Sequence, residues 1–78
     1  MKTWYMETRI DYKWNLEEDI VIGEEFYEFI VQANSKVSAR QQAFHLSEER
    51  LLNEFDNVIE ITGVVVTDIY ETSGDARL

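Results

Sequence analysis

Residues 4–14 alternate between apolar and charged side chains, and this alternation constrains the fold more than any other feature of the chain. The even positions carry the apolar series Trp4, Met6, Thr8, Ile10, Tyr12 and Trp14, in which Thr8 is the one small polar member. The odd positions carry Tyr5, Glu7, Arg9, Asp11 and Lys13. A period of two with one charged face is typical of a strand that is buried on one side and solvated on the other. Because acids and bases alternate along the charged face, we expect a central strand with a neighbour on each side.

The next stretch predicts a hairpin partner for this strand. Residues 15–19 are polar and typical of a turn, and residues 20–33 are predicted to form the second strand, with Gly23 as a bulge or bend. One face of this strand would carry Phe26, Glu28, Ile30 and Gln32, and the other Tyr27, Phe29, Val31 and Ala33. If a helix covers the Tyr27 face, Phe26 and Ile30 are exposed. The alternative is that these two side chains pack under the loop at 15–23.

A helical segment and a third strand are predicted to follow. Asn34 or Ser35 is suited to cap a helix, and Ser47 with two glutamates behind it resembles a second cap. The segment is therefore either one bent helix over 36–55 or two short helices that meet near Ser47. Residues 58–71 are rich in β-branched side chains and predict a long strand with Gly63 as a bend. One face of this strand is predicted to carry Ile59, Ile61, Val65 and Ile69.

These elements predict a small two-layer α+β domain with the order β-β-α-β. A right-handed crossover from the second strand to the third passes over the first strand, which gives a three-stranded antiparallel sheet of order 2-1-3. The helical segment, whether one bent helix or two short ones, would then lie on one face of the sheet. We expect residues 1–71 to form this single domain and residues 72–78 to form a flexible C-terminal tail, since the tail lacks apolar periodicity.

The composition sets the partners and the compartment that we expect. The chain has a formal net charge of −9, which makes free nucleic acid and anionic membranes poor partners and basic surfaces good ones. Residues 14–35 contain six acids and no Lys or Arg, and so do residues 51–76, whereas residues 29–47 contain no acid. The chain has no cysteine, so no disulfide or thiolate metal site supports it, and a cytoplasmic location is expected.

No catalytic or metal-ligating constellation stands out. His45 is the only histidine, and its neighbours Phe44 and Leu46 indicate a place at the edge of the helix's packing face. The glycines are isolated, so no phosphate-binding loop is present, and the acidic runs lack the spacing of a calcium loop. We therefore expect a protein that is not an enzyme and takes no cofactor or metal ion.

The acids of the second strand and its preceding turn are the predicted partner-binding site. This set consists of Glu17, Glu18, Asp19, Glu24, Glu25, Phe26 and Glu28. In size and charge the chain resembles the small acidic proteins with which phages and plasmids block nucleic-acid-binding defence enzymes. That resemblance implies a partner with a basic, nucleic-acid-handling surface, inhibited by nucleic-acid mimicry or steric block. The alternative hypothesis is a homo-oligomeric assembly module, such as a homodimer, in which the acidity serves solubility and protects strand edges.

Overall fold

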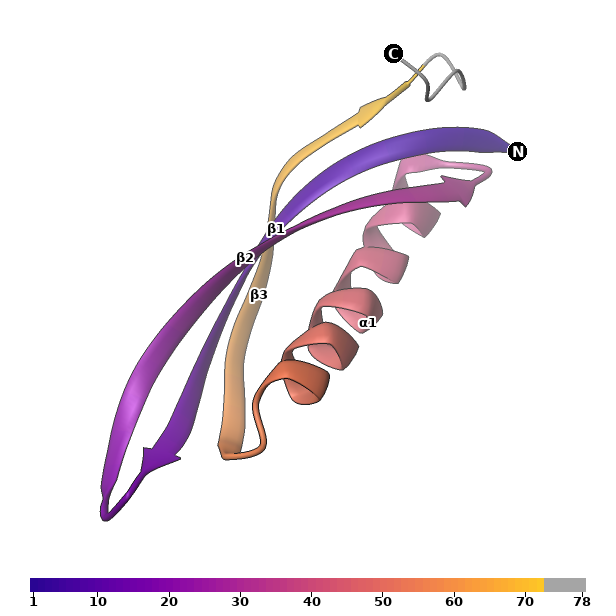
Figure 1. Cartoon of the computed structure of the whole chain (residues 1–78). Helices are drawn as coiled ribbons and strands as arrows, with labels where there is room; N and C mark the ends of the chain where they lie inside the picture. Colours follow the sequence, from indigo (N-terminus) through magenta and orange to yellow (C-terminus); the bar gives the residue numbers. More distant parts are fainter. Residues whose placement is uncertain (73–78) are drawn as a thin grey trace.

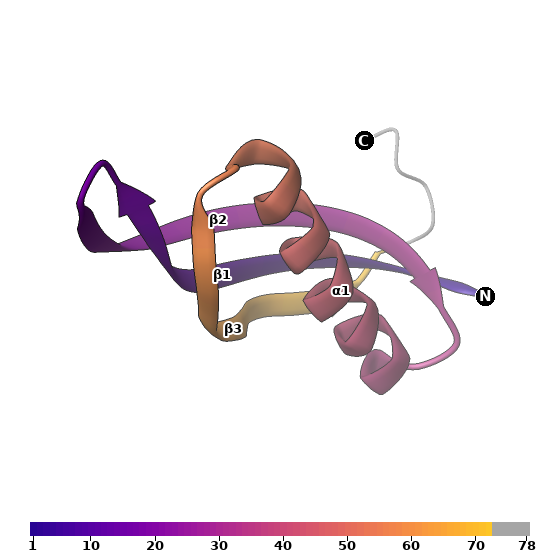
Figure 2. The same cartoon turned by 90° about the horizontal axis from the view of Figure 1, so that it is seen from below.

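The computed structural model describes residues 1–72, which form one three-stranded sheet and one helix. The elements follow in the order β1 (Lys2–Leu16), β2 (Asp19–Ala33), α1 (Lys36–Glu54) and β3 (Val58–Glu71) (Figure 1). β1 lies between β2 and β3 and is antiparallel to both. α1 crosses one face of this sheet and leaves the other face uncovered (Figure 2). The predicted α+β class, the β-β-α-β order and the strand order 2-1-3 are confirmed.

The core lies between α1 and the even-numbered side chains of β1. Met6, Thr8 and Ile10 have no exposed surface, as the alternation predicts. Trp14 departs from that prediction, because it is only half buried at the end of the sheet where α1 has finished. Its ring lies 6.3 Å from that of Phe55, measured between centroids. The apolar face of β1 is thus buried over most of its length and uncovered toward the hairpin.

α1 approaches the sheet through small residues spaced four apart. Ala39, Ala43, Ser47 and Leu51 are all fully buried. Residues four apart share one face of a helix, and the three small side chains let the helix backbone come close to β1. Toward the end of the helix, Leu51 joins a cluster with Ile10, Tyr12 and Tyr27. The narrow stripe explains why this helix has few large apolar residues.

α1 is a single continuous helix, which resolves the choice between one helix and two. Ser35 is its N-cap, and the Ser35 side chain accepts a hydrogen bond from the backbone N–H of Ser38 at 3.2 Å. The interpretation of Ser47 as a second cap is wrong. Its hydroxyl is buried inside the helix stripe and shares a 2.7 Å hydrogen bond with the hydroxyl of Thr8. Each of these two buried groups satisfies the other, so both are tolerated in the core.

The irregular strand is β3, whereas β2 runs without a bulge. The register of β3 against β1 shifts at three places, and each shift adds one residue to β3: Ile59, Thr62 and Thr67. The extra residues change which side chains face α1. Ile61 and Ile69 pack on the core, but Ile59 and Val65 are exposed, so the prediction that these two share a face with Ile61 and Ile69 is wrong. The residues that contact the core instead include Val58, Val64 and Val66.

Gly23 lies within the regular β1–β2 ladder, so its predicted bulge is wrong. Its cross-strand partner is Tyr12, and the Tyr12 ring lies directly over the glycine. A Cβ atom at Gly23 would come within 2.5 Å of Cζ of Tyr12. The glycine therefore makes room for a buried aromatic ring.

We expect Gly23→Ala to lower the free energy of unfolding by about 1–3 kcal/mol, because the Tyr12 ring must leave its place against the core. Gly63→Ala is the matched control, since a Cβ there meets only Oδ2 of Asp11 at an ordinary 3.8 Å. Urea denaturation of the two variants measures the difference. Equal midpoints would show that the ring adjusts without cost.

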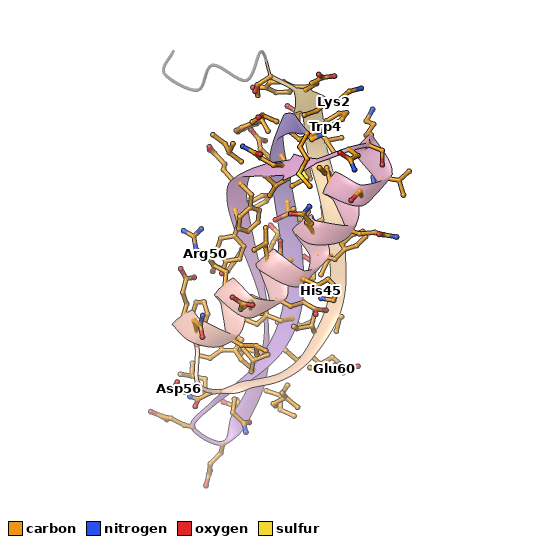
Figure 3. All side chains as sticks on the ribbon, turned by 90° about the vertical axis from the view of Figure 1, so that its right-hand side faces the viewer. Lys2, Trp4, His45, Arg50, Asp56 and Glu60 are labelled. Atoms are coloured by element: carbon orange, nitrogen blue, oxygen red, sulfur yellow. The ribbon has the colours of Figure 1, made fainter. Side chains whose placement is uncertain are left out.

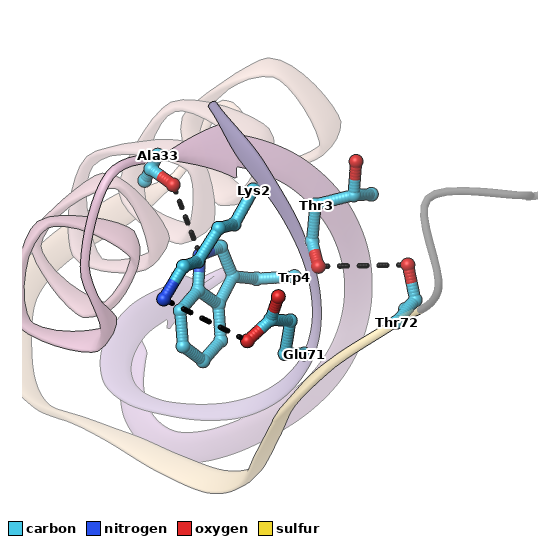
Figure 4. A network of polar contacts seen from close by, with 6 residues as sticks. All are labelled: Lys2, Thr3, Trp4, Ala33, Glu71 and Thr72. Carbon is cyan, nitrogen blue, oxygen red and sulfur yellow. Dashed lines mark hydrogen bonds and ion pairs between the residues drawn. The ribbon is translucent and has the colours of Figure 1, made fainter.

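The end of the sheet farthest from the hairpin turn is held by contacts between all three strands (Figure 4). Nε1 of Trp4 donates a 3.1 Å hydrogen bond to the carbonyl of Ala33, and Nζ of Lys2 lies 4.0 Å from Oε1 of Glu71. The backbone N–H of Thr72 donates to the carbonyl of Thr3 at 2.8 Å, so the pairing with β1 continues to Thr72. The rest of the predicted tail, residues 73–78, lies outside the described residues.

Candidate protein-binding face

The sheet face opposite α1 is not covered by any described part of the chain, and we call it the open face. Its side chains come from odd positions of β1, even positions of β2 and their register partners on β3. They are Tyr5, Glu7, Arg9, Asp11 and Lys13 on β1, Ile22, Glu24, Phe26, Glu28 and Ile30 on β2, and Glu60, Val65, Asp68 and Tyr70 on β3. The set combines six carboxylates and two bases with six aromatic or aliphatic side chains.

Three carboxylates of the open face form a row across the sheet. Glu7 on the central strand is the register partner of both Glu28 and Asp68. Among residues 1–72 no ion pair within 4.0 Å involves any of the three. Like charges placed directly opposite one another destabilise a sheet. The row therefore lowers the stability of the sheet at this place, and the fold does not explain its presence.

Tyr5 borders this row and responds to its charge. The Tyr5 hydroxyl donates a 2.6 Å hydrogen bond to Oε2 of Glu7, and its ring lies 4.9 Å from that of Tyr70. The hydrogen bond to Glu7, followed by burial and by the Glu28 carboxylate, raises the pKa of Tyr5 above its usual value. The neutral hydroxyl thus remains a donor that partly satisfies the row.

Apolar side chains stand beside the carboxylates on the same face. Phe26 is 64% exposed and lies between Glu24 and Glu28 along β2. Ile22 and Ile30 continue the line and are 80% and 61% exposed. Exposure of Phe26 and Ile30 confirms the prediction that α1 covers the other face, and the alternative of packing under the hairpin loop is wrong. Grouped exposed apolar residues with charged neighbours are typical of protein-binding surfaces.

The predicted site residues are divided between three places. Glu24, Phe26 and Glu28 share the open face, and Glu17 and Glu18 form the two-residue turn at the tip of the hairpin. Glu25 and Asp19 occupy odd positions of β2 and lie on the face toward α1. Glu25 there accepts a 3.3 Å hydrogen bond from the hydroxyl of Tyr12. The structure therefore does not bring all seven residues onto one surface.

The turn at the hairpin tip contains an unusual backbone angle. Glu17 has φ of 59°, the left-handed region that favours glycine or asparagine. A two-residue hairpin turn with a positive φ at its first position alone normally carries Gly there. The chain instead places a carboxylate at the point of the molecule that projects beyond α1 (Figure 1).

Comparisons of the chain with protein-family models, with curated proteins and with solved structures gave no match. Within residues 1–72, no group of three or more His, Cys, Asp or Glu side chains is arranged to hold a metal ion. No helix of the described chain is long and apolar enough to cross a membrane.

Residues near the end of α1 interact with the opposite face of β2. The hydroxyl of Tyr27 donates a 2.8 Å hydrogen bond to Oε1 of Glu54, and the guanidinium of Arg50 lies 5.1 Å from the centre of the Tyr27 ring. Arg50 and His45 project from opposite sides of α1 (Figure 3). His45 is exposed, so it does not pack at the edge of the core. This face of β2 is engaged within the molecule, in contrast to the open face.

Two tyrosines in this region predict a loss of stability at high pH. Burial, and then the hydrogen bond to Glu54, raise the pKa of Tyr27, while burial and the charge of Glu25 raise the pKa of Tyr12. The unfolded chain loses these protons near pH 10, before the folded protein does. The stabilisation that these tyrosines contribute is therefore fully present below about pH 10 and is lost as the pH rises toward their folded-state pKa values.

We expect the urea midpoint to fall progressively above about pH 10. Tyr27→Phe should make the decline shallower, because it removes one of the three tyrosines, Tyr5, Tyr12 and Tyr27, whose pKa is raised. Denaturation at pH 8, 10 and 11 measures both slopes. A midpoint in Tyr27→Phe that falls as steeply as in the natural protein would show that Tyr27 does not contribute.

Proposed function

We propose that this protein is a non-catalytic binding protein whose open face docks onto a basic surface of a nucleic-acid-handling protein. The proposal rests on one observation: a sheet face that no part of residues 1–72 covers, on which a row of carboxylates outside any ion pair of those residues stands beside exposed aromatic and aliphatic side chains. Charge on such a face speeds encounter with a partner of opposite sign. Aromatic side chains that lose their water in the complex then hold it together.

The spacing of the carboxylates supports nucleic-acid mimicry as the mode of binding. Glu24 and Glu28 are four residues apart on one strand, roughly 13 Å at the rise of a strand. Four base-pair steps of duplex DNA cover about the same distance. A basic groove that normally follows phosphates can therefore meet carboxylates at a matching interval. In this mode the protein acts as an inhibitor of the phage or plasmid type, which occupies the nucleic-acid site of a host defence system.

The charge of the open face disfavours the alternative of self-association through that face. Two copies placed face to face would bring six carboxylates against six, with only Arg9 and Lys13 on each side to offset them. Arg9 is already engaged, since its Nε lies 3.3 Å from Oδ1 of Asp11 and 3.9 Å from Oε2 of Glu24. Like charges across an interface cost free energy. The exposed apolar residues therefore fit a basic partner better than a second copy.

A salt-dependent capture experiment tests the proposed function. The immobilised protein is exposed to host lysate at low and at moderate salt, and bound proteins are eluted with duplex or single-stranded nucleic acid. We expect nucleic-acid-binding proteins that elute with either competitor and that bind less as salt rises. Captured proteins that ignore both salt and nucleic acid would contradict the proposal. A dimer in sedimentation velocity that buries the open face would favour the assembly module instead.

A further inference from the structure

The outer edge of β2 presents a regular series of backbone groups that pair with no strand of the described residues. At two odd positions of β1 the backbone bonds toward the β3 side. The N–H of Asn15 donates to the carbonyl of Asn57, and the carbonyl of Thr3 accepts from the N–H of Thr72. Because hydrogen-bonded pairs alternate in an antiparallel ladder, even positions of β1 bond to odd positions of β2. The even residues of β2 therefore direct their N–H and C=O groups outward. Gln42 confirms this direction, since its Nε2 donates to the outward carbonyl of Gln32 at 3.0 Å.

β2 lacks most of the features that normally prevent an edge strand from pairing. It is 15 residues long, its register against β1 is unbroken, and it contains no Pro, Lys or Arg. The other edge strand, β3, is interrupted by three register shifts. Bulges, lysines and prolines are the common devices that protect edges. Between Ile20 and Ile30 the only such device on β2 is its acidic side chains.

We propose that β2 accepts an extended basic segment of the partner as a fourth strand of the sheet. This inference rests on the proposed function and names its mode of contact. The residues whose backbone groups point outward are the same residues whose side chains lie on the open face, among them Glu24, Phe26 and Glu28. An added strand therefore sets its side chains beside two carboxylates and an aromatic ring. On the face of the added strand that lies beside Glu24, Phe26 and Glu28, two basic residues with an apolar residue between them complement these three side chains.

Glu24 and Glu28 also disfavour a second copy of β2 as the added strand. In an antiparallel pair centred on Phe26, Glu24 of each copy would stand opposite Glu28 of the other. In a parallel pair in register, each glutamate would stand opposite itself. Like charges directly opposite one another are destabilising in a sheet. The acids of β2 thus select the charge of the strand that can join it.

The probe for this inference is a ten-residue peptide, the Lys-Val peptide, in which Lys and Val alternate at every second position and Thr fills the positions between them, so that one strand face carries Lys, Val and Lys in turn. Three peptides are compared by NMR at low salt: the Lys-Val peptide, its Glu-Val analogue, and the Lys-Val peptide with every backbone nitrogen methylated. We expect the first to slow amide exchange at Glu24, Phe26 and Glu28 at least tenfold. The Glu-Val peptide should have no effect. The methylated peptide keeps the charge but cannot pair, so it should bind at least tenfold more weakly.

Phe26→Pro and Phe26→Ala provide the matched test in the protein itself. Proline at this outward position removes an N–H that β1 does not use, so the sheet is retained. We expect Phe26→Pro to bind the Lys-Val peptide at least fivefold more weakly than Phe26→Ala does.

Three outcomes would overturn the inference. Equal binding of the methylated and unmethylated peptides would show charge attraction without strand pairing. Absence of any amide effect from the Lys-Val peptide at millimolar concentration would exclude the added strand. A dimer that Phe26→Pro dissociates and Phe26→Ala does not would make a second copy the occupant. In each case the salt- and nucleic-acid-dependent capture experiment judges the proposed function separately.

Discussion

Replacing Glu24, Glu28 and Asp68 together with lysine is expected to abolish capture of the partner while the domain stays folded. All three carboxylates lie on the open face: Glu28 and Asp68 are the register partners of Glu7, and Glu24 is the register partner of Asp11. Each exposed charge alone contributes only about 0–1 kcal/mol, so single substitutions should have little effect. Reversing the charge of all three residues converts attraction for a basic surface into repulsion. Capture by the immobilised variant, compared at low salt with capture by the natural protein, measures the effect.

A control with the same change in charge separates the open face from net charge. Glu48, Glu49 and Asp56 are exposed on α1 and the loop that follows it, and their replacement by lysine leaves the open face intact. We expect this control to keep most of the binding. Equal losses in both triple variants would show that net charge matters and the open face does not. Circular dichroism of both variants verifies that the helix and sheet persist.

Ile10→Ala should lower the free energy of unfolding by about 2–5 kcal/mol. Ile10 has no exposed surface and packs in the cluster of Tyr12, Tyr27 and Leu51. A domain of this size has a total stability near the low end of about 5–15 kcal/mol, so much of the variant would be unfolded on modest warming.

Ile22→Ala is the matched control for this change, because it removes the same atoms from a side chain that is 80% exposed. Its effect should stay within about 0.5 kcal/mol. Thermal and urea denaturation compare the two variants. Similar midpoints would contradict the assignment of the even positions of β1 to the core.

The regular parts of the molecule could be predicted because they follow simple periods. The alternation over residues 4–14 placed Met6 and Ile10 in the core, and connection rules then placed β1 in the centre of the sheet. Ser35 is an N-cap in the structure because its hydroxyl accepts an otherwise unpaired N–H of the first helical turn. Phe26 is exposed because a single helix can cover only one face of the sheet.

The rest depends on contacts that no local period encodes. Three extra residues in β3 change which of its side chains face α1, and Val58, Val64 and Val66 reach the core only because of them. Ser47 looked like a cap because its buried partner, Thr8, lies far away in sequence.

The acidic row was missed for a related reason. Glu7, Glu28 and Asp68 become neighbours only through the register of two strand pairs. The placement of Glu25 was open to prediction, because it alternates with Glu24 and Phe26 along the same strand. Grouping the acids by their order in the sequence concealed that difference.

Methyl NMR of the protein bound to its captured partner tests the open face most directly. Ile22, Ile30 and Val65 carry exposed methyl groups on the open face, and Val37 and Leu52 carry comparably exposed methyl groups on α1. The proposed mode of binding predicts shifted or broadened signals from the first three and unchanged signals from the other two. Shifts confined to Val37 and Leu52, with the open-face methyl signals unchanged, would contradict it.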